Sequence, residues 1–155
     1  MYTIEEFDQC KTKVLKYVLY KKRTEREIRQ KFEGMYDSEL FEDVIADLKE
    51  NGYISDENYI QRAIYEFMAL HNLSLKEIRY KLYAKGISKE DFENFLENNL
   101  DELEEYEIQS ASNIYQKKVT SMEENEIRNY LIKKGYTKEA IDAAFDDGGR
   151  SCKTY

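Results

Sequence analysis

The chain has 155 residues, of which 36% are charged and 41% hydrophobic, with six glycines, no proline and a formal net charge of −8. The scarcity of glycine and proline excludes a fold rich in tight turns and favours helices joined by short links, and the apolar content argues against disorder. The acidic balance argues against simple adhesion to DNA or to an anionic membrane, although residues 1–35 carry a net charge of +3 and residues 36–55 a net charge of −5.

Few residues of the chain suit metal binding or catalysis. Cys10 and Cys152 lie at opposite ends, and His71 is the single histidine. Because a structural zinc site needs about four such ligands, this count excludes one. We find no glycine-rich phosphate loop and no Ser/His/Asp arrangement, and so predict a protein that is not an enzyme and needs no cofactor. The N-terminus is acidic and no apolar run approaches the roughly 20 residues of a membrane span, so we expect a soluble cytoplasmic protein.

Residues 1–55 predict three helices. The first carries apolar residues at helical spacing on one face: Phe7, Cys10, Val14, Tyr17 and Val18. Thr24 and Glu27 have the capping-box spacing that starts a short second helix, with Ile28 and Phe32 facing inward. A third helix starts at Ser38 and ends at Asn51-Gly52, where glycine tolerates the left-handed conformation that closes a helix. Its apolar face is Leu40, Phe41, Val44, Ile45 and Leu48.

Residues 56–100 predict the same plan. The first helix carries Tyr59, Ile60, Ala63, Ile64 and Phe67 on its apolar face. Ser74 with Glu77 is a second capping box, which leads into Ile78 and Leu82, and Gly86 ends that helix. Ser88 caps a third helix, whose apolar residues are Phe92, Phe95 and Leu96.

Residues 101–147 predict a looser third set, followed by a flexible tail over residues 148–155. An acidic first turn, 101–105, opens a less apolar helix with Leu103, Tyr106, Ser110 and Ile114. Ser121 with Glu124 is the expected cap of the next helix, from which Ile127, Tyr130 and Leu131 face inward. Gly135 then leads to a last helix that begins near Thr137 and carries Ile141, Ala144 and Phe145.

The three sets share a sequence repeat. Glu-Ile-Arg triplets start at residues 27, 77 and 126, and a serine or threonine follows 11 residues after each glutamate, at Ser38, Ser88 and Thr137. The sequence therefore predicts an all-α fold of three tandem three-helix repeats, 1–55, 56–100 and 101–147, which form an elongated, curved array.

Several segments resemble the RecX family. Residues 44–59 are similar to the junction between the first two repeats of that family, where an apolar helix ends in Gly-Tyr and an acidic pair and an aromatic residue follow. Residues 74–88 are similar to the signature of the second repeat, and the basic link 20–24 precedes a capped helix as it does there. The resemblance extends from about Cys10 to Phe145.

The resemblance implies a regulator of the RecA recombinase. Such a protein lies in the helical groove of the RecA–DNA filament and modulates, most often inhibits, ATP hydrolysis and strand exchange in recombination, DNA repair and the SOS response. The implied partner is therefore the RecA filament, with contacts to DNA inside the filament, and we expect a monomer.

The candidate partner-binding residues are basic, with one tyrosine among them: Lys13, Lys16, Tyr20, Lys21, Lys22, Arg23, Arg26, Arg29, Arg79, Lys81, Lys85 and Arg128. If the first helix continues to Arg23, then Lys13, Lys16, Tyr20 and Arg23 share one face, at steps of 3, 4 and 3 residues. The triplet arginines form a periodic row that suits a periodic partner, and Tyr20 and Tyr83 are expected exposed anchors.

A structural role is the alternative for many of these residues. Lysine and arginine also solubilise exposed faces, and Glu25 and Glu27 are placed to pair with some of them. The triplet arginines can instead cover apolar surface with their stems, and His71 fits the end of a helix. Two other functions stay open: a helix-turn-helix-like nucleic-acid module, and a helical-repeat adaptor for another protein.

Overall fold

The protein is all-helical over the residues described by the structure, a computed structural model. Backbone is described for residues 1–70 and 72–153, and side chains for 1–70 and 72–146. His71, Cys152 and the predicted tail 148–155 therefore lie outside the described side chains, although α9 extends into that tail. The helices are α1 (Ile4–Tyr20), α2 (Glu25–Phe32), α3 (Ser38–Glu50), α4 (Asp56–Leu70), α5 (Leu75–Ala84), α6 (Lys89–Asn98), α7 (Leu100–Lys118), α8 (Glu124–Lys134) and α9 (Lys138–Lys153).

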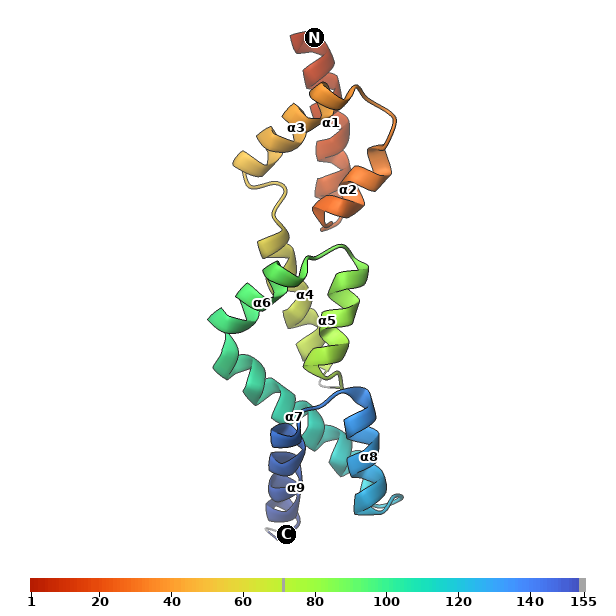
Figure 1. Cartoon of the computed structure of the whole chain (residues 1–155), viewed down its shortest axis with the longest axis vertical. Coiled ribbons are helices and arrows are strands. Elements are labelled where there is room, and N and C mark those ends of the chain that lie inside the picture. Colours follow the sequence, from red (N-terminus) through yellow and green to blue (C-terminus); the bar gives the residue numbers. More distant parts are fainter. Residues whose placement is uncertain (71, 154–155) are drawn as a thin grey trace.

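The helices follow one another along an elongated molecule whose two ends hold the two termini (Figure 1). We call α1–α3, α4–α6 and α7–α9 the first, second and third groups. The middle helices α2, α5 and α8 lie one below another on the same side of the molecule in Figure 1. The predicted all-α fold is confirmed over the described residues.

Each group has a separate hydrophobic core. The first core is made by α1–α3 and Ile54, and the faces predicted from helical spacing are the ones that are buried or half-buried in it. The second core is made by α4–α6, Ile87 and two residues of α7, Leu103 and Tyr106. The third core takes Ala111, Ile114 and Tyr115 from the rest of α7, together with α8 and α9. The long helix α7 thus serves two cores.

The helix ends agree with most of the predicted caps. Thr24 and Ser74 each accept a hydrogen bond from the backbone N–H three residues later, and the glutamate at that position bonds back to the N–H of the cap. Ser88 accepts from the N–H of Asp91 at 3.1 Å. Gly52 follows α3 with φ of +80°, as the prediction of a left-handed glycine requires.

Three predictions about local structure are wrong. Ser121 does not cap α8: the helix starts at Glu124 after Glu123, which makes no side-chain cap bond, and the Ser121 hydroxyl donates to the carbonyl of Lys118 instead. Tyr130 is 37% exposed rather than inward-facing. The first helix ends at Tyr20, because the backbone at Lys21 is extended, so Arg23 is not part of its face.

Candidate partner-binding site

The helix caps hold neighbouring groups together. The Thr24 hydroxyl accepts from the N–H of Glu27 and donates to the carbonyl of Lys85 in the second group, at 2.6 Å. Ser74 repeats this bond toward the third group, donating to the carbonyl of Lys134 at 2.8 Å. Both cap side chains are fully buried. The capping residues therefore carry two functions, one local and one at the interface between groups.

The capping glutamates and the glycines complete these interfaces. The carboxylate of Glu27 lies 3.8 Å from the ammonium of Lys85, and that of Glu77 lies 3.2 Å from the ammonium of Lys134. Gly86 packs directly against the stem of Arg26, since a Cβ at Gly86 would lie 2.6 Å from the Cβ of Arg26. Lys76 meets Gly135 in the same way, at 2.9 Å. Arg26 also donates to the carbonyl of Ala84 at 3.2 Å, so this candidate residue and Lys85 are engaged between groups.

A buried carboxylate reinforces the second interface. Glu107 of α7 is 3% exposed and accepts the backbone N–H groups of Leu75 and Thr137, at 3.3 and 2.8 Å. Burial raises the pKa of this carboxyl, and the two N–H donors oppose that effect. Asp56 accepts one N–H, that of Glu25, at the first interface. The sequence analysis missed Glu107, because nothing in an acidic helix distinguishes the one carboxylate that becomes buried.

Two of the three triplet arginines, Arg29 and Arg128, form ion pairs within their own groups, whereas the Nε of Arg79 is buried with no hydrogen-bond partner in the described part of the chain. Arg29 bonds to Glu25 at 2.9 Å and to Glu42. Arg128 bonds to Asp142 at 2.8 Å and lies 4.5 Å from the ring centre of Phe145. Arg79 is half-buried, with its guanidinium 5.4 Å from the ring centre of Phe92. These contacts favour the structural alternative, in which the arginine stems and charges stabilise each group.

The remaining basic candidates lie mostly in the first group. Lys13, Lys16 and Tyr20 are exposed on α1, and Tyr20 is 83% exposed. Lys21 and Lys22 are exposed in the link that follows. Arg23 is half-buried and turns back over Tyr17, with its guanidinium 3.8 Å from the ring centre. Among the residues with described side chains, none of these five cations is within ion-pair distance of a carboxylate.

Two candidates from the second group stand apart from that cluster. Lys81 is exposed, with its ammonium 5.9 Å from the ring centre of Phe67. The prediction of an exposed Tyr83 is wrong: the residue is half-buried and its ring packs against Phe92 with the centroids 6.3 Å apart.

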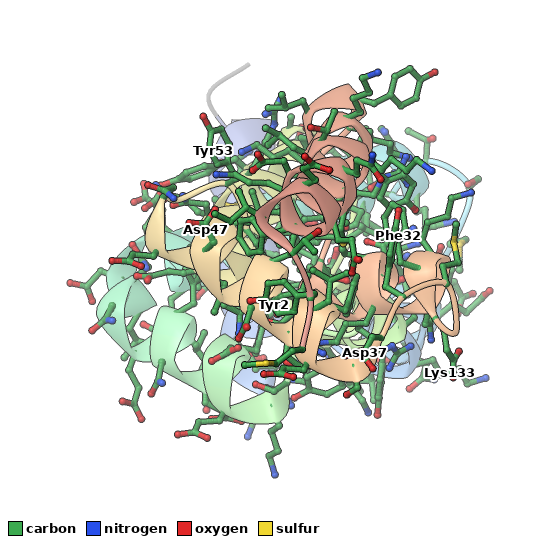
Figure 2. All side chains as sticks on the ribbon, turned by 90° about the horizontal axis from the view of Figure 1, so that it is seen from above. Tyr2, Phe32, Asp37, Asp47, Tyr53 and Lys133 are labelled. Atoms are coloured by element: carbon green, nitrogen blue, oxygen red, sulfur yellow. The ribbon has the colours of Figure 1, made fainter. Side chains whose placement is uncertain are left out.

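A cleft of about 510 Å³ opens beside the first cluster, between the end of α1 and α4. The link from Tyr20 to Arg23 forms one wall, and Tyr53, Tyr59 and Arg62 contribute to the other. Figure 2, which looks down the long axis, shows Tyr53 and Asp47 on one side of the molecule and Phe32 on the other. The sequence analysis placed residues 52–59 at a family junction but did not assign Tyr53, Tyr59 or Arg62 to a site. Only the folded chain brings them beside residues 20–23.

None of the helices in the described part of the chain is long and apolar enough to cross a membrane.

Comparisons with known proteins point to one family. No protein-family model matches the chain. The regulatory protein RecX of Finegoldia magna is 31% identical over 141 residues, which cover 86% of this chain and 69% of that protein. The regulatory protein RecX of Clostridium beijerinckii is 32% identical over 145 residues, or 87% of this chain and 66% of that protein. The chain thus spans about two thirds of the length of these relatives.

Two solved structures share the fold. A crystal structure of RecX from Lactobacillus salivarius superposes with a TM-score of 0.76 and 21% identity, over 95% of this chain and 99% of that one. A crystal structure of regulatory protein RecX gives a TM-score of 0.69, also at 21% identity, over 91% of this chain and 73% of that one.

Proposed function

Because the chain belongs to the RecX family of regulatory proteins, we propose that it binds the RecA–DNA filament and inhibits ATP hydrolysis and strand exchange. In the cell this activity restrains recombination, DNA repair and the SOS response. The observation that supports a binding role is a concentration of unpaired cations in the first group of a protein whose net charge is −8. Such a local excess of positive charge steers and orients an acidic partner.

We propose that only some of the candidate residues bind the partner. We assign binding to the exposed tract of Lys13, Lys16, Tyr20, Lys21 and Lys22, with Arg23 beside it. Arg26, Arg29, Lys85 and Arg128 act mainly through the fold, because each already bonds to a group of this chain. The three groups of helices follow one another along the long axis of the molecule (Figure 1). Such an elongated shape suits contacts with more than one protomer of a filament.

The test is RecA-dependent ATP hydrolysis on single-stranded DNA during titration with this protein. We expect suppression well below one copy per RecA protomer, with weak binding to DNA alone because of the acidic balance. No change in ATP hydrolysis would refute the proposal. Tight binding to DNA together with unchanged hydrolysis would instead favour a nucleic-acid module, and the absence of both effects would favour an adaptor for another protein.

A charge-matched pair of variants tests the assignment of residues. Reversing Lys13, Lys16, Lys21 and Lys22 to glutamate should raise the concentration needed for half inhibition at least tenfold. The control reverses four exposed lysines elsewhere, namely Lys89, Lys117, Lys133 and Lys138. Both variants change the net charge equally, so a similar loss in both would show that only the overall charge matters and would contradict the assignment.

A further inference from the structure

The turn that follows α3, at residues 51–55, forms part of the cleft between α1 and α4. Tyr53 and Ile54 both donate their N–H groups to the carbonyl of Leu48, at 2.8 and 3.3 Å, after the left-handed turn at Gly52. Ile54 is 4% exposed in the first core, whereas Tyr53 is 44% exposed. This irregular turn separates α3 from α4 and forms part of the cleft wall. The second and third groups are joined differently, since only Asn99 separates α6 from α7.

One wall of the cleft carries cationic groups that no carboxylate among the described side chains neutralises. Lys21 and Lys22 are exposed, and the Arg23 guanidinium is held against the Tyr17 ring. The Nε of Arg23 is buried and has no hydrogen-bond partner within the described part of the chain. A guanidinium carries planar N–H donors that suit a carboxylate, and this one is held in position at the cleft by the Tyr17 ring.

The opposite wall offers hydroxyl groups and apolar surface. Tyr53 and Tyr59 bring phenol groups and Ala63 brings aliphatic surface, while Val18 and Leu19 at the end of α1 add apolar surface beside the cations. Burial raises the pKa of Tyr59, so its hydroxyl stays protonated at neutral pH. Arg62 also faces the cleft, but its charge is shared with Glu66 at 3.6 Å. A short segment with both carboxylate and apolar side chains finds complementary groups on both walls.

From these observations we propose that the cleft binds an acidic segment of a protein partner, whose aspartate or glutamate side chains bond to Lys21, Lys22 and Arg23. The inference deepens the proposed function and rests on it for the identity of the partner, but not for the chemistry of the cleft. Local charge favours a short peptide over a nucleic acid, because Lys21, Lys22 and Arg23 form one compact cluster in the cleft wall. A phosphate backbone needs a longer series of cations than this cluster provides.

The experiment uses two labelled probes of equal charge and the full chain. One is an eight-residue peptide that alternates glutamate and leucine, and the other is a thymidine pentanucleotide with four phosphates. Fluorescence anisotropy at low salt should show saturable peptide binding at least tenfold tighter than binding of the pentanucleotide. Tighter binding of the pentanucleotide would overturn the proposal in favour of phosphate recognition, and absence of saturable peptide binding would also overturn it.

Substitutions in the cleft test where the labelled peptide binds. Replacing Lys21, Lys22 and Arg23 with glutamine should weaken peptide binding at least tenfold, whereas the same change at Lys89, Lys117 and Lys133 should weaken it less than twofold. Arg23→Lys keeps the positive charge but removes the planar set of guanidinium N–H donors, so it should lower the affinity for the peptide severalfold. Equal losses in the two triple variants would overturn the proposal. Circular dichroism and urea midpoints identify any variant that fails to fold. If the triple variant at residues 21–23 fails to fold, peptide binding by Arg23→Lys tests the proposal, and unchanged binding by that variant would overturn it.

The outcomes for the two proposals are separable. Peptide binding in the cleft without any effect on RecA would refute the proposed function and leave the cleft assignment intact. Inhibition of RecA that persists unchanged after substitution of Lys21, Lys22 and Arg23 would refute the cleft as the partner site and leave the proposed function intact. Amide resonances of Gly52 and Tyr53 should shift when the peptide is added, and shifts confined to α8 would contradict the assignment.

Discussion

The interface role of Thr24 leads to a sharp prediction about stability. Its hydroxyl accepts from the N–H of Glu27 at 3.2 Å and donates to the carbonyl of Lys85 at 2.6 Å, in a fully buried position. Thr24→Val keeps the shape of the side chain and removes both hydrogen bonds. A lost cap destabilises a protein by about 0.5–2 kcal/mol. A carbonyl left without its partner adds about 1 kcal/mol or more.

We therefore expect Thr24→Val to lower the free energy of unfolding by about 2–3 kcal/mol. Thr3→Val is the matched control, because the Thr3 hydroxyl caps α1 through the N–H of Glu6 at 3.1 Å but is exposed and makes no bond to another group. Water replaces the lost bond there, so the cost should stay near 0.5–1 kcal/mol, roughly the lower half of the range for a cap.

Urea unfolding followed by far-ultraviolet circular dichroism at pH 7 measures both variants. Thr24→Ser keeps both hydrogen bonds and should lose much less stability than Thr24→Val. Equal losses in Thr24→Val and Thr3→Val would refute the reasoning, because they would mean that the bond to Lys85 contributes nothing. A severe loss in Thr24→Ser would also count against it, since the methyl group rather than the hydroxyl would then be the important part.

Three further predictions test the interfaces. Ser74→Ala should lower the free energy of unfolding by about 2 kcal/mol in the same assay, because it removes the equivalent pair of bonds, whereas a change below about 0.5 kcal/mol would contradict this role. Gly86→Ala should lower the free energy of unfolding by about 2–4 kcal/mol, because Gly86 has φ of +101° and an added Cβ would lie 2.6 Å from the Cβ of Arg26. Gly34→Ala should lower it by only about 1–2 kcal/mol, because Gly34 has φ of +76° but no atom within 4 Å of an added Cβ. Similar losses in the two variants would argue against the contact with Arg26. Burial raises the folded-state pKa of Glu107, so protonation of this carboxyl favours the folded state. The wild-type chain should therefore gain stability relative to Glu107→Gln as the pH falls from 7 toward the ordinary pKa of 4.5, and lose it as the pH rises. Urea titrations across this range that show a constant stability difference, or one that shrinks as the pH falls, would refute the burial argument.

Sequence alone predicted the helices and most of their caps. The apolar spacing identified the buried faces of α1, α3 and α4, and the capping boxes at Thr24 and Ser74 were correct, because both signals operate within about one helical turn. The errors at Ser121 and Tyr130 fall in the third group. The cap position of α8 is Glu123, so it carries no buried hydroxyl, and Glu126 is exposed.

Residue type and spacing thus determined an all-helical chain and its family, since these depend on local propensity and on order along the chain. Tertiary structure alone decided which charges are available to a partner. Thr24 and Ser74 find their second hydrogen-bond partners 61 and 60 residues further along the chain. Glu25 and Glu27 were expected to pair with basic residues, but the pairing of Arg29 with Glu42 and of Arg128 with Asp142 was not predicted from spacing. The cleft beside Arg23 depends equally on packing, because the end of α1, the turn at residues 51–55 and α4 line it together.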